Sequence, residues 1–232
     1  MNEECLICKA PLKYTENGVF MECAICHKKE ETKTFCENGH YVCNECHING
    51  VDRIISVCMN ETDKNPIKIY NKIVNMNFCH MHGPEHHIIV GSALLTAYKN
   101  SGGNIDLYKC LSEMQQRGKK IPGGVCGFWG ACGAAISSGI FISVISDSTP
   151  LTEKPFGLAN MMTSKALCSI GKIGGPRCCK RNSYIALLNA IDFVRDNFGI
   201  EMEKEIPCCA FSDKNNQCLG EKCPFSKKKT GA

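Results

Sequence analysis

The chain has 232 residues, of which 44% are hydrophobic and 22% charged, and its net charge is +4. This is the composition of an ordinary globular protein, with room for one medium domain and a small one. The longest apolar stretch, Ile136–Ile145, is interrupted by Ser and Gly and is too short to cross a bilayer. The mild charge permits an anionic substrate or a nucleic-acid contact without requiring either.

Nineteen cysteines are the anomaly of this composition. The first residues, MNEECLIC, contain no apolar core of a signal peptide. The cysteines occur as Cys-x2-Cys pairs and beside histidines, which is the spacing of metal ligands. We therefore predict metal binding in a reducing cytoplasm rather than a disulfide framework.

Residues 1–47 are predicted to form a zinc-binding module. Its small core could not fold alone, so metal binding would supply most of the folding free energy. Two tetrahedral zinc ions need eight nitrogen or sulfur ligands. Eight such residues lie close together here: Cys5, Cys8, Cys23, Cys26, Cys36, His40, Cys43 and Cys46.

Two ligand pairings are open for this module. The spacing from Cys23 to Cys46 resembles the first six ligands of a RING finger. An interleaved pairing would join Cys23/Cys26 to Cys43/Cys46, and Cys5/Cys8 to Cys36/His40. A sequential zinc ribbon would instead use Cys5, Cys8, Cys23 and Cys26. His27 and His47 are interpreted as solvated residues rather than ligands, and the module as a structural or docking unit.

Helical periodicity predicts a mainly α fold for the rest of the chain. Residues 48–78 form a connector of two short helices, separated by a polar turn before Pro66. Residues 79–200 form a helical domain, and residues 201–232 form a Cys-rich tail. Helices in the domain are expected over residues 87–99, 104–115, 131–144, 156–170 and 183–197.

A His-rich turn, residues 79–87, directly precedes the first helix of this domain. A helix N-terminus favours thiolates and anionic substrates, and so many titratable groups on one turn are typical of an active site. The alternatives are a further zinc site or a surface turn capped by Glu85. The predicted catalytic residues are Cys79, His82, Glu85 and His86.

The central stretch, Gly123–Asn182, combines five cysteines with Gly-rich turns that can point backbone N–H groups at a ligand. Thiolates bind iron well, and three protein ligands on a four-iron cluster leave one Lewis-acidic iron. The alternatives are a closed structural site or redox thiols. The closed site would use Cys126, Cys132, Cys168 and Cys178.

The segments GACGAAISSGIF and LCSIGKIGGPRCCKRN resemble the α-domain of iron–sulfur L-serine dehydratases, a plan shared with iron–sulfur cysteine desulfidases. The resemblance implies a [4Fe–4S] cluster held by Cys132, Cys168 and Cys178, with Cys126 or Cys179 as alternative ligands. The Ser-Ser-Ser-His substrate motif of the dehydratases is absent, so L-serine itself is not implied. The whole chain also resembles a family of zinc-headed proteins of anaerobic archaea and bacteria.

A carboxylate-bearing substrate could be gripped near this cluster. Lys165 or Lys180 would supply a cation, and Arg181 a bidentate fork beside Asn182. The tail cysteines could bind a third metal, or one of them could cap the open iron; these are Cys208, Cys209, Cys218 and Cys223. The lysine run after them is interpreted as a solvated end with at most weak nucleic-acid contact.

The sequence thus predicts a cytoplasmic [4Fe–4S]-dependent lyase or desulfidase that acts on a small carboxylate-bearing molecule and carries two zinc ions. One alternative is [4Fe–4S]-dependent sulfur transfer to tRNA or to a cofactor precursor. The other is a non-catalytic metal-binding adaptor. No membrane partner is expected.

Overall fold

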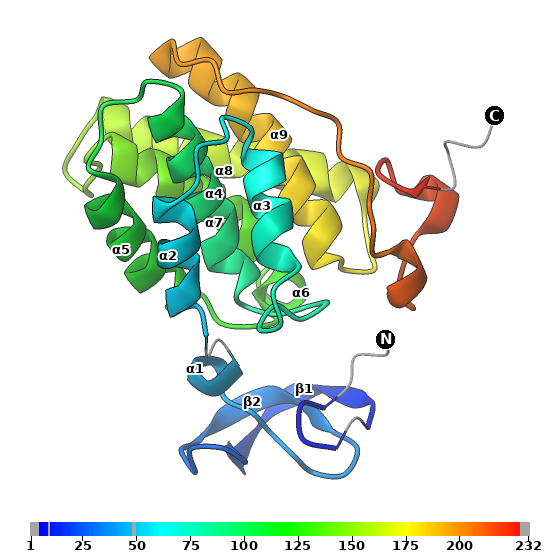
Figure 1. Ribbon diagram of the computed structural model, residues 1–232. Helices are drawn as coiled ribbons and strands as arrows, with labels where there is room; N and C mark the ends of the chain where they lie inside the picture. Colours follow the sequence, from blue (N-terminus) through cyan, green and yellow to red (C-terminus); the bar gives the residue numbers. More distant parts are fainter. Residues whose placement is uncertain (1–4, 9, 48–49, 228–232) are drawn as a thin grey trace.

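The structure of the protein is a computed structural model that describes residues 5–8, 10–47 and 50–227. Figure 1 shows a helical body, a small head that contains both strands, and a C-terminal tail that passes back along the body. The predicted mainly α fold with an N-terminal Cys-rich module is confirmed. Of the lysine run, Lys228 and Lys229 lie outside the described residues.

The head is an antiparallel hairpin of β1 (Leu12–Glu22) and β2 (Lys29–Cys36), followed by the short helix α1 (Asn44–His47). Its buried apolar cluster consists of Cys23, Tyr41 and Cys43, with a few half-buried side chains around it. A two-stranded hairpin with so small a core is marginal in water. The head therefore needs a further source of stability.

The body is built from helices that follow the predicted periodicity. Local signals set several of their ends: Asn65 caps α3 by accepting from the Ile67 N–H, and Asp106 caps α5 by accepting from the Lys109 N–H. The helices are α2 (Asp52–Met59), α3 (Pro66–Val74), α4 (His86–Asn100), α5 (Leu107–Gly118), α6 (Val125–Phe128), α7 (Gly133–Ile145), α8 (Lys154–Ile173) and α9 (Cys179–Phe198).

Helix α4 is the centre of the body. It is buried from His86 to Tyr98 and packs against α2, α3, α5, α7 and α9. A helix that is covered on all sides carries apolar or small residues all round, as α4 does. Its few polar groups are satisfied internally: the Thr96 hydroxyl donates to the Ser92 carbonyl, and the Gly91 N–H donates to the Ser137 hydroxyl of α7.

The close approach of α7 to α4 requires glycine at position 133. A Cβ there would overlap the ring of His87, which is buried and donates from Nδ1 to the Ile121 carbonyl at 3.1 Å. We expect Gly133→Ala to destabilise the body by about 1–3 kcal/mol, because the ring cannot move without losing that bond. Gly171→Ala, in open space on α8, is the control and should be neutral or stabilising by up to about 1 kcal/mol. Urea unfolding followed by helical circular dichroism distinguishes the two; equal midpoints would contradict the expectation.

Two helix ends differ from the predicted ones and affect the site. Helix α9 begins at Cys179 rather than residue 183, because the Cys178 thiol caps it by accepting from the Arg181 N–H. This places Lys180 and Arg181 in the buried first turn. Helix α8 continues to Ile173, so Cys168 lies within the helix and is exposed.

The tail, residues 201–227, contains two short 3-10 turns, η1 (Ser212–Lys214) and η2 (Gly220–Lys222), and an isolated bridge between Cys209 and Ser226. Among the described helices, none combines the length and the apolar character needed to span a bilayer.

Candidate metal centres and active site

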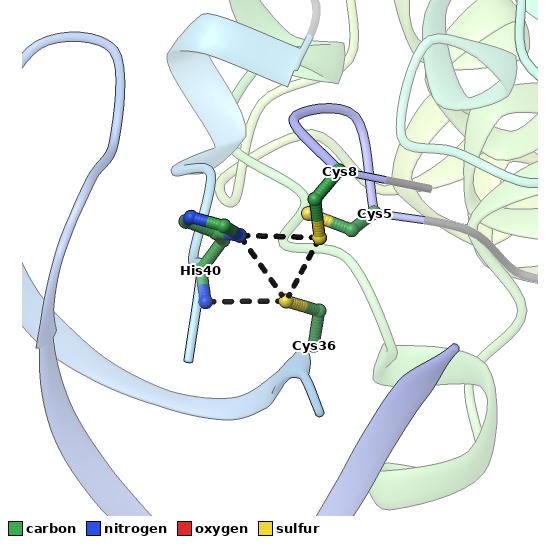
Figure 2. A group of neighbouring side chains, drawn as sticks. All are labelled: Cys5, Cys8, Cys36 and His40. Carbon is green, nitrogen blue, oxygen red and sulfur yellow. Dashed lines mark hydrogen bonds between the residues drawn. The ribbon is translucent and has the colours of Figure 1, made fainter. Parts of the chain in front are cut away.

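The first metal centre lies in the head. Its ligand atoms all lie within 4.8 Å of one another (Figure 2) and belong to Cys5, Cys8, Cys36 and His40. These residues come from the N-terminal turn, the end of β2 and the turn that follows β2. The Sγ atoms of Cys8 and Cys36 lie 3.8 Å apart. A tetrahedral zinc ion with Zn–S bonds of about 2.3 Å separates its sulfurs by about 3.8 Å. The group could therefore hold a metal such as zinc.

The second group in the head that could hold a metal consists of Cys23, Cys26, Cys43 and Cys46. The Sγ atoms of Cys26 and Cys43 lie 3.5 Å apart, and backbone N–H groups of Cys43 and Cys46 point at the sulfurs. The structure thus has the interleaved pairing rather than the sequential ribbon. The hairpin causes the interleaved pairing. Because its strands are antiparallel, the end of β1 leads to Cys23 in one group, whereas the end of β2 carries Cys36 in the other.

The two histidines interpreted as solvated residues differ from each other. His27 is exposed and pairs with Glu22 at 2.9 Å, as expected. His47, at the end of α1, is turned toward the body and meets His80 and Glu85. The interpretation of His47 as a solvated residue is therefore corrected.

His47, His80 and Glu85 form a third centre, at the junction of head and body. The Nδ1 atom of His47 lies 3.5 Å from Oε2 of Glu85, and Nδ1 of His80 lies 3.4 Å from Oε1. Both Nδ1 atoms and Oε2 are buried, and none has a hydrogen-bond partner among the described residues. Buried polar atoms without partners are costly, so their convergence indicates a ligand that the three atoms share. Two histidines and one carboxylate are the protein ligands of many catalytic metal ions.

Local sequence explains how Glu85 reaches this position. Glycine at position 83 is required, because a Cβ there would overlap the Glu85 carboxylate. The His80 N–H donates to Oε1 at 2.7 Å and fixes the carboxylate. Burial would raise the pKa of Glu85, but the neighbouring rings of His47, His80 and His86 hold it well below its usual range. Glu85 is therefore a buried carboxylate, and the alternative of a surface turn capped by it is wrong.

A second group of side chains surrounds Lys180, directly behind Glu85. The Lys180 Nζ donates to the His80 carbonyl at 2.6 Å and to Nε2 of His86 at 3.0 Å, and lies 3.6 Å from the Cys79 sulfur. Burial, followed by the charge of Lys180, lowers the pKa of His86 well below its usual value, so the ring is neutral. Its Nδ1 lies 3.1 Å from the Tyr70 hydroxyl. These contacts join Lys180, His86 and Tyr70 in one buried chain of hydrogen-bonding groups.

The Cys79 thiol is also neutral. Burial raises its pKa to about 12, although Lys180 acts in the opposite direction. Cys79, Glu85 and His86 lie within 4.8 Å of one another through their ligand atoms. The structure therefore brings together three of the four predicted catalytic residues. His82, the fourth, lies apart from them: its Nε2 is 3.3 Å from Oδ1 of Asn215 in the tail.

The three predicted substrate-binding residues have different surroundings. Lys180 lies at the centre just described. The Arg181 guanidinium donates to the carbonyls of Gly174 and Pro176 at 2.9 and 2.8 Å, and thus holds the loop before α9. Asn182 donates to the Cys132 sulfur at 3.4 Å. Because the Arg181 guanidinium already donates to these backbone carbonyls, the structure does not favour bidentate binding of a substrate carboxylate by Arg181.

The predicted cluster ligands do not assemble as one set. Cys132 and Cys178 are buried near the N-terminus of α9, with the alternative ligands Cys126 and Cys179 nearby. Cys168 is exposed, and its neighbour Ser169 hydrogen-bonds Asn189, three turns into α9. At 1.5 Å per residue this is about 16 Å along α9 from Cys178. Helix α8 continues past Cys168 to Ile173, which sets Cys168 back from the loop before α9.

Sequence reasoning missed His47 and His80 as parts of a site. The signal for His80 was present, since it belongs to the same His-rich turn as Cys79 and Glu85. No local pattern marks His47, because its partners lie more than thirty residues away in the chain.

Comparison with known proteins adds one finding. Residues 54–226 match the family model described as "Family of unknown function (DUF5714)". The match covers α3–α9 and the tail to Ser226, and it excludes the hairpin and α1. No curated protein and no solved structure matches the chain.

Proposed function

The chain belongs to the DUF5714 family, and we propose that it is a metal-dependent lyase that acts on a small carboxylate-bearing molecule at the centre formed by His47, His80 and Glu85. The observation that supports this most is the convergence of three buried ligand atoms without hydrogen-bond partners. They come from the head and the body, so the centre is complete only when both are folded. The head itself carries two structural zinc ions in this proposal.

The ligand set supports an open rather than a closed metal site. Three protein ligands leave at least one coordination position for water or substrate. The Glu85 side chain is fully buried, whereas those of His47 and His80 are 22% and 32% exposed. In this proposal the open position lies toward the two histidine rings, which form the more exposed side of the centre. A divalent metal there would act as a Lewis acid on the leaving group.

The surroundings favour an anionic substrate. A divalent ion together with Lys180 carries more positive charge than Glu85 and the neutral His86 can balance, and such an excess attracts carboxylates. Lys180 donates from Nζ to His86, and the His86 ring connects to Tyr70. This path can deliver a proton to a leaving group or receive one from the substrate. A Lewis acid assists departure of the leaving group in an elimination, and a proton path serves its acid–base step; the residues for both lie side by side here.

This proposal keeps the predicted lyase chemistry but assigns the Lewis acid to a metal at Glu85 instead of the predicted iron–sulfur cluster. The predicted open [4Fe–4S] cluster requires Cys132, Cys168 and Cys178 together, and the exposed position of Cys168 on α8 argues against that set. The centre at Glu85 supplies an open metal from residues that already meet.

Metal analysis of Glu85→Gln tests the proposal. We expect the anaerobically purified protein to lose one equivalent of metal, because glutamine lacks the anionic oxygen, while the zinc of the head stays. His82→Ala is the matched control from the same turn and should keep the full complement. The loaded wild-type protein should release ammonia, sulfide or water from at least one of a panel of small amino, thio and hydroxy acids, and Glu85→Gln should lose that turnover by about 100-fold or more.

Two outcomes would contradict this. If Glu85→Gln retains both the metal and the turnover, the three atoms do not form a metal centre. If the metal is lost but the loaded wild-type protein turns over none of the acids, the centre is a structural tie between head and body, as in the adaptor alternative.

A further inference from the structure

Four cysteines line one small cavity between the tail and the N-terminus of α9. Cys209, Cys218 and Cys223 come from the tail, and Cys178 is the residue that caps α9. Apolar side chains close the cavity, among them Phe211 and Phe225. All four thiols are free, and Cys178, Cys209 and Cys223 are buried. Cys208, the remaining tail cysteine, is exposed and does not line the cavity.

Hydrogen-bond donors point at these sulfurs. The backbone N–H groups of Phe211 and Gly220 lie 3.4 Å from the Sγ atoms of Cys209 and Cys218. Cys178 receives the Arg181 N–H at 3.5 Å and the Asn215 amide at 3.6 Å. The same two-residue spacing from N–H to sulfur occurs in the head, where the Ile7 N–H lies 3.4 Å from Cys5. Such donors stabilise thiolates that carry charge, as metal-bound thiolates do.

The charge at the cavity also favours an anion. Arg181 lines it and is 3% exposed, and no carboxylate of the described residues pairs with its guanidinium. A buried charge without a counter-charge is strongly unfavourable. Four thiolates around a metal site carry a net negative charge that would balance Arg181.

The geometry points to an iron–sulfur cluster, of the [4Fe–4S] class, held by Cys178, Cys209, Cys218 and Cys223. The spacing of the sulfurs distinguishes it from a zinc site. In the head, the four ligand atoms of each group lie within 4.8 Å of one another. Among the described residues Cys178, Cys209, Cys218 and Cys223, no three sulfurs lie that close together. A single tetrahedral zinc ion brings sulfurs to about 3.8 Å. A cluster places each thiolate on a different iron and so spreads them further apart.

This cluster differs in role from the Lewis-acid metal of the proposed function and does not depend on it. Four protein ligands leave no open iron, so the cluster anchors the tail, which has almost no secondary structure to hold it. The anchored segment includes Phe211, whose ring lies 5.0 Å from the Nζ of Lys180. The cluster thereby holds in place both the first turn of α9 and the Phe211 ring next to Lys180.

Anaerobic reconstitution of the full chain with iron and sulfide tests this inference. We expect about four irons and four sulfides per chain and an electron paramagnetic resonance signal after reduction. The double variant with Cys209→Ala and Cys218→Ala should lose more than nine-tenths of the iron, since only two thiolates of the site remain. Cys208→Ala, next to a ligand, and Cys168→Ala, on α8, are the matched controls and should keep it. Zinc content and circular dichroism show whether each variant is folded.

Other results overturn the inference. Zinc in the cavity in place of iron would make it a single-ion site. Loss of iron in Cys168→Ala or Cys208→Ala, or its retention in the double variant, would assign the cluster to other ligands. Iron X-ray absorption of the wild-type protein needs no variant, and a lack of iron–iron scattering would exclude a cluster.

Discussion

Removal of metal is expected to unfold the head, residues 5–47, and to leave the helical body folded. The reason is that the apolar cluster of the head consists of Cys23, Tyr41 and Cys43 and is too small to stabilise a two-stranded hairpin. Structural zinc sites of this kind contribute about 10–16 kcal/mol of apparent binding free energy, which exceeds the stability of such a module. After chelation, the backbone amides of β1 and β2 should therefore lose their protection from hydrogen exchange, whereas those of α4 and α7 should keep it.

A pair of histidine variants tests the same expectation without a chelator. His40→Ala removes one of the four ligands beside Cys8 and Cys36, and should release one zinc ion and increase exchange in the hairpin. His27→Asn is the matched control, because His27 is exposed and its φ of 61° is tolerated by asparagine. Full protection of β1 and β2 in the metal-free protein would contradict the expectation.

Lys180→Met is expected to lower the turnover of the proposed reaction by about 100-fold or more while the metal remains bound. Lys180 is 1% exposed and donates to the His80 carbonyl and to His86, so no other described side chain can take its place in the proton path. Methionine fills a similar volume, and the variant should therefore fold. The measurement is kcat on the acid that the wild-type protein turns over fastest, together with metal content.

The control and a second readout separate chemistry from structure. Lys165→Met removes the exposed lysine of α8, the other cation considered for the substrate, and should leave kcat unchanged. Nitrogen NMR of the histidine rings should show a changed His86 signal in Lys180→Met, because Nε2 loses its donor at 3.0 Å. Equal kcat values for the two lysine variants would show that Lys180 takes no part in the reaction.

The helices of the body and the Cys-x2-Cys pairs of the head were predictable because their sequence signals are local. Each Cys-x2-Cys pair places two sulfurs on one ion through the geometry of a single turn, whatever the rest of the chain does. The predicted helices from residue 66 onward all occur, since a periodic apolar face forms wherever a core is available to cover it. The main errors lie at the two ends that flank Cys178, where α8 is longer than predicted and α9 begins earlier.

The assembly of distant side chains was not predictable in the same way. The sequence by itself indicated groups of cysteine and histidine that could hold a metal, a helical body, and a turn from Cys79 to His87 that carries titratable groups. Only the tertiary structure decided that His47 meets His80 and Glu85, and that Cys178 joins the tail cysteines rather than Cys168. The physical reason is that these contacts depend on how whole helices pack, and a thiol or an imidazole has the same local pattern whether it is a ligand or not.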